Sequence, residues 1–494
     1  MPEQQQSSYD VVVVGGGNAG HAAALSAAER GRRVLVLEKG VRGEHGGNSY
    51  YTAGAMRVIH GDVDSVRDLV DDDPRLDTSV LPPYTAEDFR ADMARVTGGG
   101  NDAELTDVLI AESEPVMRWL KQHGLSFRLM YERQAYIAET GPDAGRHVFW
   151  GGLAIGSTGG GKGLIEQHEA AAAKAGVEVR YGCAATGLVV EDGRVVGVRY
   201  EQDGTTAELQ ADSVILAAGG FEANAELRRR HLGEGWQRAK VRGTPLNTGD
   251  MIQAALEIGA VAYGDWSTCH SVAWDAGAGD EGDRDLTNQL TRGGYPLGIM
   301  VNKEGRRFVD EGADFRNYTY AKYGRHILAQ TDGLAYQLFD AISRKMLRTE
   351  EYDAPGTTEV TADSIAGLAA KLGIDEESLA RTVTEFNASI DGSVPFDAAV
   401  KDGRRADVEP PKSNWALPLE TGPFYAFPVT CGITFTFGGL RADTHGRVLA
   451  ESGAPIDGLF VCGEMLGGLF SGNYPGGTGL VSGAVFGRRA GAVA

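Results

Sequence analysis

Cysteine is scarce in this sequence, with 4 residues in a chain of 494. No two cysteines form a CxxC pair and none lies near a histidine at the spacing of metal ligands, so we expect no bound metal. The sequence also lacks a CxxCH haem motif and the cysteine set that an iron–sulfur cluster needs. We interpret Cys183, Cys269, Cys431 and Cys462 as reduced, buried thiols of a cytosolic protein.

Long apolar runs are missing as well. No stretch approaches the roughly 18 apolar residues of a membrane-spanning helix, so we expect no insertion into a membrane. The first eight residues are polar and lack the basic and apolar regions of a signal peptide. These absences predict a cytoplasmic protein whose N-terminus, residues 1–8, is disordered.

Positive charge is in deficit, because Lys and Arg total 47 while Asp and Glu total 68, which gives a net charge of −21. This balance argues against nucleic acid and anionic membrane surfaces as main partners. An anionic small substrate stays compatible with it, because a local arginine cluster outweighs a distant, screened negative field.

Glycine, in contrast, is abundant, with 70 residues. No collagen-like period is present, so we read the glycines as tight turns and close backbone approaches. The length predicts two or three domains, and the 42% of hydrophobic residues excludes global disorder.

A strand, a glycine-rich turn and a helix follow one another near the N-terminus. Residues 10–14 form an apolar β-branched run that predicts a buried strand, and residues 15–20 read Gly-Gly-Gly-Asn-Ala-Gly. An alanine-rich helix is expected to about Arg30, and a second buried strand, Val34–Leu37, ends at Glu38. This βαβ unit predicts a dinucleotide-binding fold.

The glycines at positions 15, 17 and 20 fit the pattern GxGxxG. The first permits a tight turn, the second lets the backbone approach a pyrophosphate, and the third lets helix and strand pack closely. The helix N-terminus offers N–H groups to phosphates, and Glu38 is expected to accept hydrogen bonds from a ribose. We predict a bound dinucleotide; the alternative is a glycine-rich turn without a ligand.

Three further glycine-rich segments favour FAD over NAD. Residues 46–56 carry glycines and small polar side chains that can line the ribityl chain and ring of a flavin. Residues 456–464 predict a strand that ends in Gly463 and Glu464, whose carboxylate can meet ribityl hydroxyls. Residues 476–479 open a helix whose N–H groups can stabilise the negative charge of a reduced flavin. The alternative is a set of loops that cap core helices.

The remaining pattern predicts an α/β protein in which a discontinuous, Rossmann-like FAD-binding domain carries an inserted α+β capping domain. A more polar region from Asp265 to Pro428, with helices at 364–371 and 376–390, is expected to be the insertion. The expected domains are residues 9–264 for the first part of the FAD-binding domain, 265–428 for the cap, and 429–494 for the closing part. Outside the cap, helices are expected within 85–122 and strands at 177–181, 186–190, 195–200, 213–218 and 459–462.

Taken together, these motifs resemble the flavoprotein family of fumarate reductases, succinate dehydrogenases and L-aspartate oxidases, whose fold ketosteroid dehydrogenases and urocanate reductases share. The resemblance covers about residues 9–492. Within the family, the sequence is most similar to the tricarballylate dehydrogenases. That similarity rests on residues 47–57, 432–437, 473–477 and 482–489.

The resemblance implies non-covalent FAD, because the family's covalent-flavin histidine aligns with Asn48. Together with the motifs above, it gives a set of expected cofactor-binding residues from seven regions of the chain. They are Gly15, Gly17, Asn18, Ala19, Gly20, Glu38, Lys39, Gly47, Asn48, Ser49, Thr52, Ala53, Gly54, Ala185, Ala218, Gly219, Glu464, Gly479, Leu480 and Val481.

Two catalytic residues are implied by the resemblance. The family carries its catalytic arginine after a VNxxGxRF-like segment, and Arg316 lies near that offset after Val301–Phe308. We expect Arg316 to act as the base; the alternative is a guanidinium that only binds a carboxylate. His270 resembles the family's substrate-carboxylate histidine, and its alternative is a core histidine.

The sequence departs from fumarate reductases at several substrate positions. Thr434 and Phe435 stand where those enzymes carry a second histidine, and Tyr474 stands where they carry a second substrate arginine. Tyr474 and Thr436 are therefore candidates for bonds to substrate oxygens, with packing as the alternative.

The proton-relay acid and arginine of the fumarate reductases also have no counterpart in register. They fall at Thr291 and Gly294 in this chain. Arg292 is then at most a displaced substitute for the relay arginine. It is also a candidate clamp for a substrate carboxylate, and its alternative is a solvated loop charge.

The expected reaction removes vicinal hydrogens beside a carboxylate: a base takes the α-proton, and flavin N5 takes the β-hydrogen as hydride. The first hypothesis is an FAD-dependent dehydrogenase that converts tricarballylate to cis-aconitate. The second keeps the fold but changes the substrate to another acid, an amino-acid derivative or a ring ketone, as a desaturase, reductase or oxidase. The third is a non-catalytic flavoprotein subunit of a larger electron-transfer complex. A separate acceptor (a protein, a quinone or oxygen) is expected to take the electrons.

Overall fold

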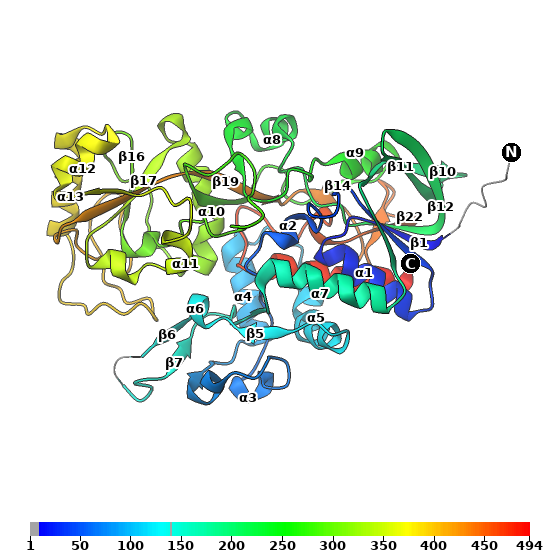
Figure 1. Ribbon diagram of the computed structural model, residues 1–494, viewed down its shortest axis with the longest axis horizontal. Coiled ribbons are helices and arrows are strands. Elements are labelled where there is room, and N and C mark those ends of the chain that lie inside the picture. Colours follow the sequence, from blue (N-terminus) through cyan, green and yellow to red (C-terminus); the bar gives the residue numbers. More distant parts are fainter. Residues whose placement is uncertain (1–8, 139–140) are drawn as a thin grey trace. The chain divides into compact units, whose positions relative to one another are not determined.

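The computed structural model describes residues 9–138 and 141–494, so the disorder expected at residues 1–8 falls outside the described part of the chain. The described chain divides into two compact units, whose elements are labelled in Figure 1. The first unit holds the described residues up to Gly233, then Gly243–Cys269 and Phe435–Ala494. The second holds Glu234–Arg242 and His270–Thr434. The first unit is therefore discontinuous in sequence and the second is inserted into it, as predicted for an α/β protein with a discontinuous FAD-binding domain and an inserted cap.

An eight-stranded sheet forms the centre of the first unit, in the order β10-β11-β12-β1-β2-β9, with β22 paired to both β12 and β21. Val11–Val14 of β1 are fully or almost fully buried, because a parallel strand is covered on both faces and β-branched side chains suit that position. The strands expected at 10–14 and 34–37 are confirmed. The parallel members are β1 (Tyr9–Val14), β2 (Val34–Glu38), β9 (Glu178–Tyr181), β12 (Thr205–Leu216) and β22 (Pro455–Val461).

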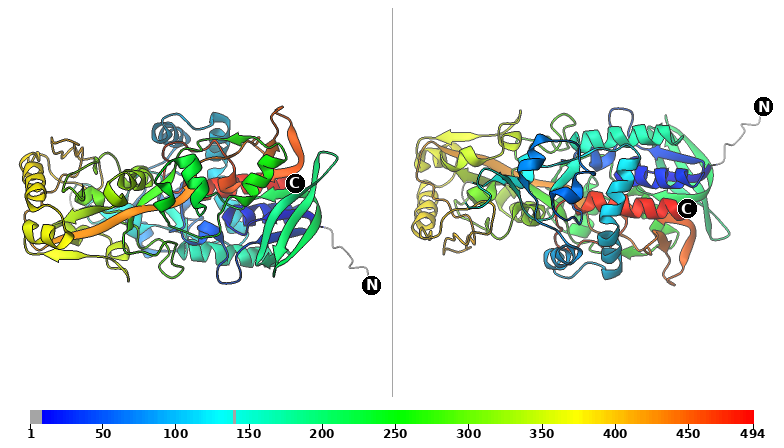
Figure 2. Two further views of the ribbon diagram at one scale, coloured as in Figure 1. Left: turned by 90° about the horizontal axis from the view of Figure 1, so that it is seen from above. Right: turned by 90° about the horizontal axis from the view of Figure 1, so that it is seen from below.

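Helices α1 (Asn18–Glu29) and α14 (Thr478–Val493) pack backbone to backbone in this unit. A Cβ at Gly487 would overlap Ala19 O, and a Cβ at Gly491 would overlap Ala23 O, so only glycine fits at both positions. Both views in Figure 2 show the two helices side by side, α1 in blue and α14 in red. This contact brings the first and the last helix of the described chain together.

The rest of the first unit extends the sheet and covers it. β10 and β11 form a hairpin that pairs with β12, in agreement with the strands expected at 186–190, 195–200 and 213–218. α4 begins at a capping box formed by Thr85 and Asp88. The elements are α2 (Gly47–Tyr50), β3 (Ala55–Met56), α3 (Val63–Val66), η1 (Pro74–Thr78), β4 (Ser79–Val80), α4 (Ala86–Thr97), α5 (Ala103–Gln122), β5 (Phe127–Leu129), α6 (Tyr131–Gln134), β6 (Ala135–Ile137), β7 (His147–Phe149), β8 (Ile155–Ser157), α7 (Gly160–Lys174), β10 (Cys183–Glu191), β11 (Arg194–Gln202), α8 (Ala225–Leu232), α9 (Asp250–Glu257), β14 (Ala262–Tyr263), β20 (Gly439–Leu440), β21 (Arg447–Leu449) and η6 (Gly463–Met465).

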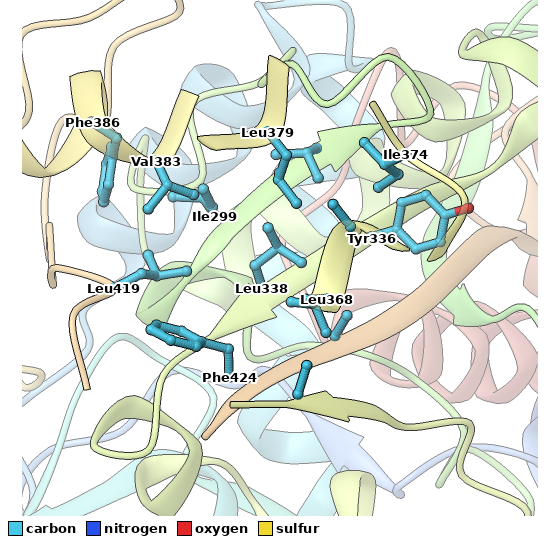
Figure 3. Close-up of a cluster of buried hydrophobic side chains, with 14 of the residues drawn as sticks. Ile299, Tyr336, Leu338, Leu368, Ile374, Leu379, Val383, Phe386, Leu419 and Phe424 are labelled. Carbon is cyan, nitrogen blue, oxygen red and sulfur yellow. The ribbon is translucent and has the colours of Figure 1, made fainter. Parts of the chain in front are cut away.

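The second unit is built on a six-stranded sheet in the order β13-β19-β17-β16, with β15 and β18 also paired to β19. Leu338 on this sheet, Leu368 and Phe386 belong to one buried apolar cluster, shown in Figure 3. α12 and α13 agree with the helices predicted at 364–371 and 376–390 to within two residues at each end. The elements are η2 (Trp236–Arg238), β13 (Lys240–Val241), β15 (Cys269–Asp275), η3 (Tyr295–Leu297), β16 (Ile299–Asn302), α10 (Arg316–Leu328), η4 (Thr331–Gly333), β17 (Ala335–Phe339), η5 (Ser343–Met346), α11 (Thr349–Tyr352), β18 (Val360–Ala362), α12 (Ile365–Leu372), α13 (Glu376–Ala388) and β19 (Phe424–Thr436).

The boundaries of the second unit differ from the predicted cap at 265–428. Residues 234–242, which the sequence placed in the FAD-binding domain, belong to the second unit. The reason is that β13 pairs in parallel with β19, Lys240 opposite Gly432 and Val241 opposite Ile433. A strand of two residues has no periodicity that a sequence pattern can reveal.

Two stacked histidines lie inside the first unit. His21 on α1 and His168 on α7 have ring centroids 5.5 Å apart, and His168 Nε2 lies 3.0 Å from Asn18 Oδ1. Burial lowers the pKa of His21 to about 4 and the pKa of His168 well below 6.5. Both rings are therefore neutral in the folded protein near neutral pH, whereas in the unfolded chain they take up protons near their ordinary pKa.

Replacing His168 by glutamine, which carries no titrating proton, is expected to stabilise the protein increasingly, relative to the wild type, as pH falls below 6.5. A base with a depressed folded pKa stabilises the fold above its unfolded pKa and loses that contribution as pH falls, for His168 from 6.5 downward. The slope is at most about 1.4 kcal/mol per pH unit for each histidine. Urea unfolding of both proteins across this window measures the slopes, and equal slopes would contradict the prediction.

Candidate functional site

In the glycine-rich turn after β1, packing against neighbouring backbone requires glycine at two positions but not at a third. Gly15 has a φ of +107°, and a Cβ there would overlap Ala217 O. A Cβ at Gly20 would overlap Gly15 O, so neither position accepts another residue. A Cβ at Gly17 would meet Ser49 Oγ at 3.4 Å, an ordinary contact. Packing alone does not demand Gly17, which fits a glycine kept so that a ligand can approach.

Glu38 at the end of β2 lies against this turn. Its carboxylate accepts hydrogen bonds from Gly16 N at 2.8 Å and from Gly40 N at 2.7 Å. Burial raises the pKa of Glu38, and these backbone N–H groups oppose the rise. Lys39 differs from expectation, because its ammonium is held by Thr248 Oγ1 at 2.7 Å and Asp250 Oδ2 at 2.9 Å. Its side chain therefore anchors the start of α9.

Asn18 joins three of the predicted segments. Its backbone N–H donates to Ser49 Oγ at 3.1 Å, and its Nδ2 donates to Leu480 O at 2.8 Å in the first turn of α14. The N-termini of α1 and α14 are thus tied to the same side chain. Because the first turn of a helix has N–H groups without intrahelical partners and a positive dipole end, two such termini favour an anionic group nearby.

The segment 52–54 is a tight loop against the start of α7. Gly161 N donates to Thr52 O at 2.9 Å, and Gly54 N donates to Thr52 Oγ1 at 3.1 Å. A Cβ at Gly54 would overlap Ser157 Oγ, and its φ of +74° also requires glycine. The expected residues Thr52 and Gly54 are thus held in a fixed loop against Ser157 and Gly161.

A buried carboxyl pair occupies the carboxyl end of β12, and the sequence reasoning identified only one of its members. Glu222 Oε1 accepts hydrogen bonds from Asn48 Nδ2 and from Asn247 Nδ2, both at 2.6 Å. Glu464 Oε1 accepts from Thr436 N at 2.7 Å and from Thr436 Oγ1 at 3.0 Å. The expected residue Thr436 is thus a partner of Glu464 inside the first unit.

Burial raises the pKa of Glu464 to about 7 and the pKa of Glu222 well above 4.5, where the Glu464 charge adds to the rise. Glycines make room for the pair and its partners. A Cβ at Gly220 would overlap Glu464 Oε1, and a Cβ at Gly219 would overlap Asn247 Nδ2. The expected residue Ala218 lies beside them, with its N–H on Met465 Sδ at 3.2 Å. Ala185 is buried on β10, opposite Tyr200.

In the second unit, Arg316 forms a buried ion pair that the sequence did not predict. Its Nη1 donates to both carboxylate oxygens of Glu351, at 3.0 and 2.9 Å. Burial lowers the pKa of Arg316 and the Glu351 charge raises it, with a net rise. Arg348 Nη1 lies 3.6 Å from Glu351 Oε1, so one buried carboxylate contacts two guanidinium groups.

His270 and Arg242 form a second group in this unit, and sequence reasoning missed Arg242. His270 is buried on β15 and its ring contacts Tyr320 edge to face, with centroids 4.9 Å apart. Burial, with a smaller contribution from the Arg242 charge, lowers the pKa of His270 well below 6.5. Arg242 donates from Nε to Thr291 Oγ1 at 3.0 Å and from Nη1 to Thr434 Oγ1 at 2.9 Å.

Arg292 has a structural role in place of the expected substrate clamp. Nη2 and Nε donate to Asp275 Oδ2 at 2.6 and 3.2 Å, and both side chains are fully buried. Nη1 donates to Gln289 O and Glu351 O, and Nη2 also donates to Thr357 Oγ1. These bonds engage all five N–H groups of the guanidinium. Neither the clamp nor its alternative, a solvated loop charge, describes this arginine.

Tyr474 lies in an aromatic cluster of the first unit. Its ring contacts Phe435 edge to face at 5.0 Å and Phe470 at 5.4 Å between centroids. The expected residues Gly479, Leu480 and Val481 form the first turn of α14, close to this cluster: a Cβ at Gly479 would meet the Phe435 ring at 3.7 Å. The cluster therefore borders the helix N-terminus.

Comparison with known proteins identifies the family. The model of the FAD binding domain family matches residues 10–481. The chain belongs to this family. It is 30% identical over 488 residues to a fumarate reductase (cytochrome) of Shewanella frigidimarina, covering 98% of this chain and 76% of that protein. It is 31% identical over 519 residues to the urocanate reductase of Eggerthella lenta, covering 99% of this chain and 75% of that protein.

A solved structure agrees. The open conformation of a flavocytochrome c3 fumarate reductase matches with a TM-score of 0.72 and 27% identity, covering 99% of this chain and 78% of that one. The chain is thus an FAD-dependent oxidoreductase of the fumarate reductase type. Within the described residues, no helix has the length and apolar character to cross a membrane, and no cluster of three or more histidine, cysteine or acidic side chains has the geometry of a metal site.

The residues present fit FAD. The open position at Gly17 and the paired helix N-termini of α1 and α14 would hold a pyrophosphate, and Glu38 would accept from a ribose. Glu464 would meet the ribityl chain. When bound, FAD supplies a ring that takes up or gives back a hydride.

Replacing Glu38 by alanine is expected to weaken FAD binding by about 10- to 100-fold, because a charged acceptor is worth roughly 1.5–3 kcal/mol in a hydrogen bond. Thermal stability should fall with it, since bound FAD stabilises the fold. Titration of the FAD-depleted protein with FAD, followed by fluorescence, measures the affinity. Glu44→Ala, an exposed carboxylate six residues away, is the matched control. A Glu38→Ala protein that purifies fully loaded would contradict the assignment.

Replacing Glu222 by glutamine, which mimics the protonated acid, is expected to stabilise the protein increasingly as pH rises. An acid with a raised folded pKa contributes stability below its unfolded pKa and loses it as pH rises through the folded value. For the wild type the loss begins at about pH 4.5 for both acids, and for Glu464 it continues to about pH 7. Denaturation midpoints of both proteins across that range test the sign. A Glu222→Gln midpoint that falls relative to wild type with rising pH would oppose it.

Proposed function

We propose that this FAD-dependent oxidoreductase acts on a carbon–carbon bond next to a carboxylate, and that it oxidises a saturated polycarboxylate of the tricarballylate type to the alkene, cis-aconitate. The observation that carries the proposal is the buried Arg316–Glu351 pair in the second unit. The names of two relatives, fumarate reductase and urocanate reductase, support it, because both name an acid with a carbon–carbon double bond beside the carboxylate.

Arg316 would exchange the α-proton, and Glu351 gives that role a physical basis. A guanidinium is normally always protonated, so it can serve as a base only if its own proton has somewhere to go. Glu351 is that acceptor: its carboxylate is buried and lies 2.9 Å from Arg316 Nη1. From Glu351, Arg348 Nη1 at 3.6 Å is the next group, and its side chain is partly exposed. Arg316, Glu351 and Arg348 thus form a path from a buried nitrogen toward solvent.

The opposite direction, reduction of an unsaturated acid, is a second candidate that one observation favours. Glu351 raises the pKa of Arg316, which stabilises the protonated guanidinium at rest. A protonated Arg316 is ready to donate to a carbon rather than to accept from one. The same residues serve both directions, and the substrate and electron acceptor decide which one runs.

An anaerobic spectrum of the holoenzyme tests the proposal. Addition of tricarballylate is expected to bleach the flavin band, whereas succinate should do so more slowly or not at all. If only the chemically reduced enzyme responds, regaining its band with cis-aconitate, the reductive direction is the physiological one. If no acid of the panel changes either spectrum, the proposed substrate class is wrong.

Arg316→Gln is expected to lower kcat by about 10²- to 10⁴-fold, the range typical of a lost general acid or base. FAD content should stay unchanged. Arg306→Gln, at an exposed arginine of the same unit, is the matched control and should retain full turnover. Steady-state rates with an artificial electron acceptor measure the effect. A loss in Arg316→Gln of less than tenfold would assign this residue to carboxylate binding only.

We further propose that the electrons leave to a separate acceptor (a protein, a quinone or oxygen), and that the protein works in the cytoplasm. Its four cysteines are buried free thiols, which supports a reducing compartment. Full turnover of the isolated chain with an artificial acceptor would exclude the alternative of a non-catalytic flavoprotein subunit.

A further inference from the structure

Arg242 is fixed at the edge of the second unit's sheet. It follows β13, and its backbone N–H donates to Ile433 O at 2.7 Å, which continues the pairing of β13 with β19. A Cβ at Gly432 would meet Arg242 Cβ at 3.3 Å. The backbone position of this arginine is therefore set by the sheet rather than by a loop.

The direction of its side chain is fixed as well. Thr291 Oγ1 accepts from Nε and Thr434 Oγ1 accepts from Nη1, at 3.0 and 2.9 Å. The guanidinium carbon lies 5.8 Å from the centroid of the Trp274 ring. The Thr291 and Thr434 hydroxyls, together with the nearby Trp274 ring, fix the orientation of the guanidinium. Arg242 is 9% exposed. Such preorganisation favours recognition of a planar carboxylate, because little conformational entropy is lost on binding.

Arg242 also lies close to the other substrate candidates of this unit. Its charge helps to lower the pKa of His270. Thr291, which holds Arg242, is two residues from Gly293, where a Cβ would meet Arg316 Nη1 at 2.6 Å. The segment 291–293 thus lies against both guanidinium groups, and two residues of extended chain span about 7 Å. This is the length scale of a small polycarboxylate.

We propose that Arg242 is a specificity-determining residue that binds a second carboxylate of the substrate, and that Thr291 and Thr434 are positioning residues that aim it. The proposal rests on the proposed function and deepens it: the substrate class becomes acids with at least two carboxylates, one near Arg316 and one on Arg242. Monocarboxylates are then poor substrates because they leave Arg242 unused.

The test measures dissociation constants of propionate, succinate and tricarballylate for the holoenzyme, from the perturbation of the flavin spectrum and from calorimetry. Arg242→Gln is expected to weaken tricarballylate binding by about 10- to 100-fold and propionate binding less than threefold. The KM for tricarballylate should rise much more than its kcat falls. Arg242→Lys should be intermediate, because it keeps the charge but loses the planar fork.

Variants of Thr434 test its positioning role separately. They also keep the proposal testable if Arg242→Gln does not fold. Thr434→Val should reduce the preference for tricarballylate over propionate, and Thr434→Ser, which keeps the hydroxyl, should restore it. Equal losses for mono- and polycarboxylates, or a lower thermal stability without a change in preference, would overturn the proposal and leave Arg242 a structural residue. A wild-type enzyme that binds none of the three acids would overturn the proposed function and this inference together. A wild type that binds them while Arg242→Gln keeps its preference overturns only the inference.

Discussion

The backbone contact between α1 and α14 is the constraint on which the first unit depends. Gly487 and Gly491 let the last helix approach Ala19 and Ala23 more closely than any side chain would allow. That approach aligns the two helix N-termini, which Asn18 then joins through Ser49 and Leu480. Because the contact closes the unit with the last residues of the chain, a long segment can leave and return between them without breaking the cofactor fold.

Much of this architecture can be predicted from the sequence because it depends on local patterns. The strand before Gly15, the glycine spacing and the acid at position 38 lie within 30 residues, and each has its own physical reason. The position of Gly479–Val481 at the start of a helix could be predicted for the same reason, because the local sequence pattern indicates that helix. No sequence pattern indicates that residues 234–242 belong to the second unit, since a strand of two residues is defined only by its partner β19.

The candidate functional side chains also differ in whether a local sequence pattern predicts them. Arg292 and Arg316 have the same chemistry in the sequence, and only tertiary contacts separate them: Asp275 and backbone carbonyls engage one, while Glu351 engages the other. Arg242 and Glu222 lie in segments without a motif, far in the chain from Thr434 and Glu464, so no spacing reveals them. Within a chain of net charge −21, these arginines place local positive charge in the second unit, which is what the proposed carboxylate site requires.

The two sets of buried titratable groups have a joint consequence for how the wild type responds to acid. Unfolding lets His21 and His168 bind protons, whereas it lets Glu222 and Glu464 release them. Between about pH 4.5 and 6.5 the two proton transfers run in opposite directions and offset each other. Because the two effects cancel, the free energy of unfolding is expected to change little with pH in mildly acidic solution. A flat profile of this kind does not mean that no group titrates, since four buried groups change their protonation when the chain unfolds.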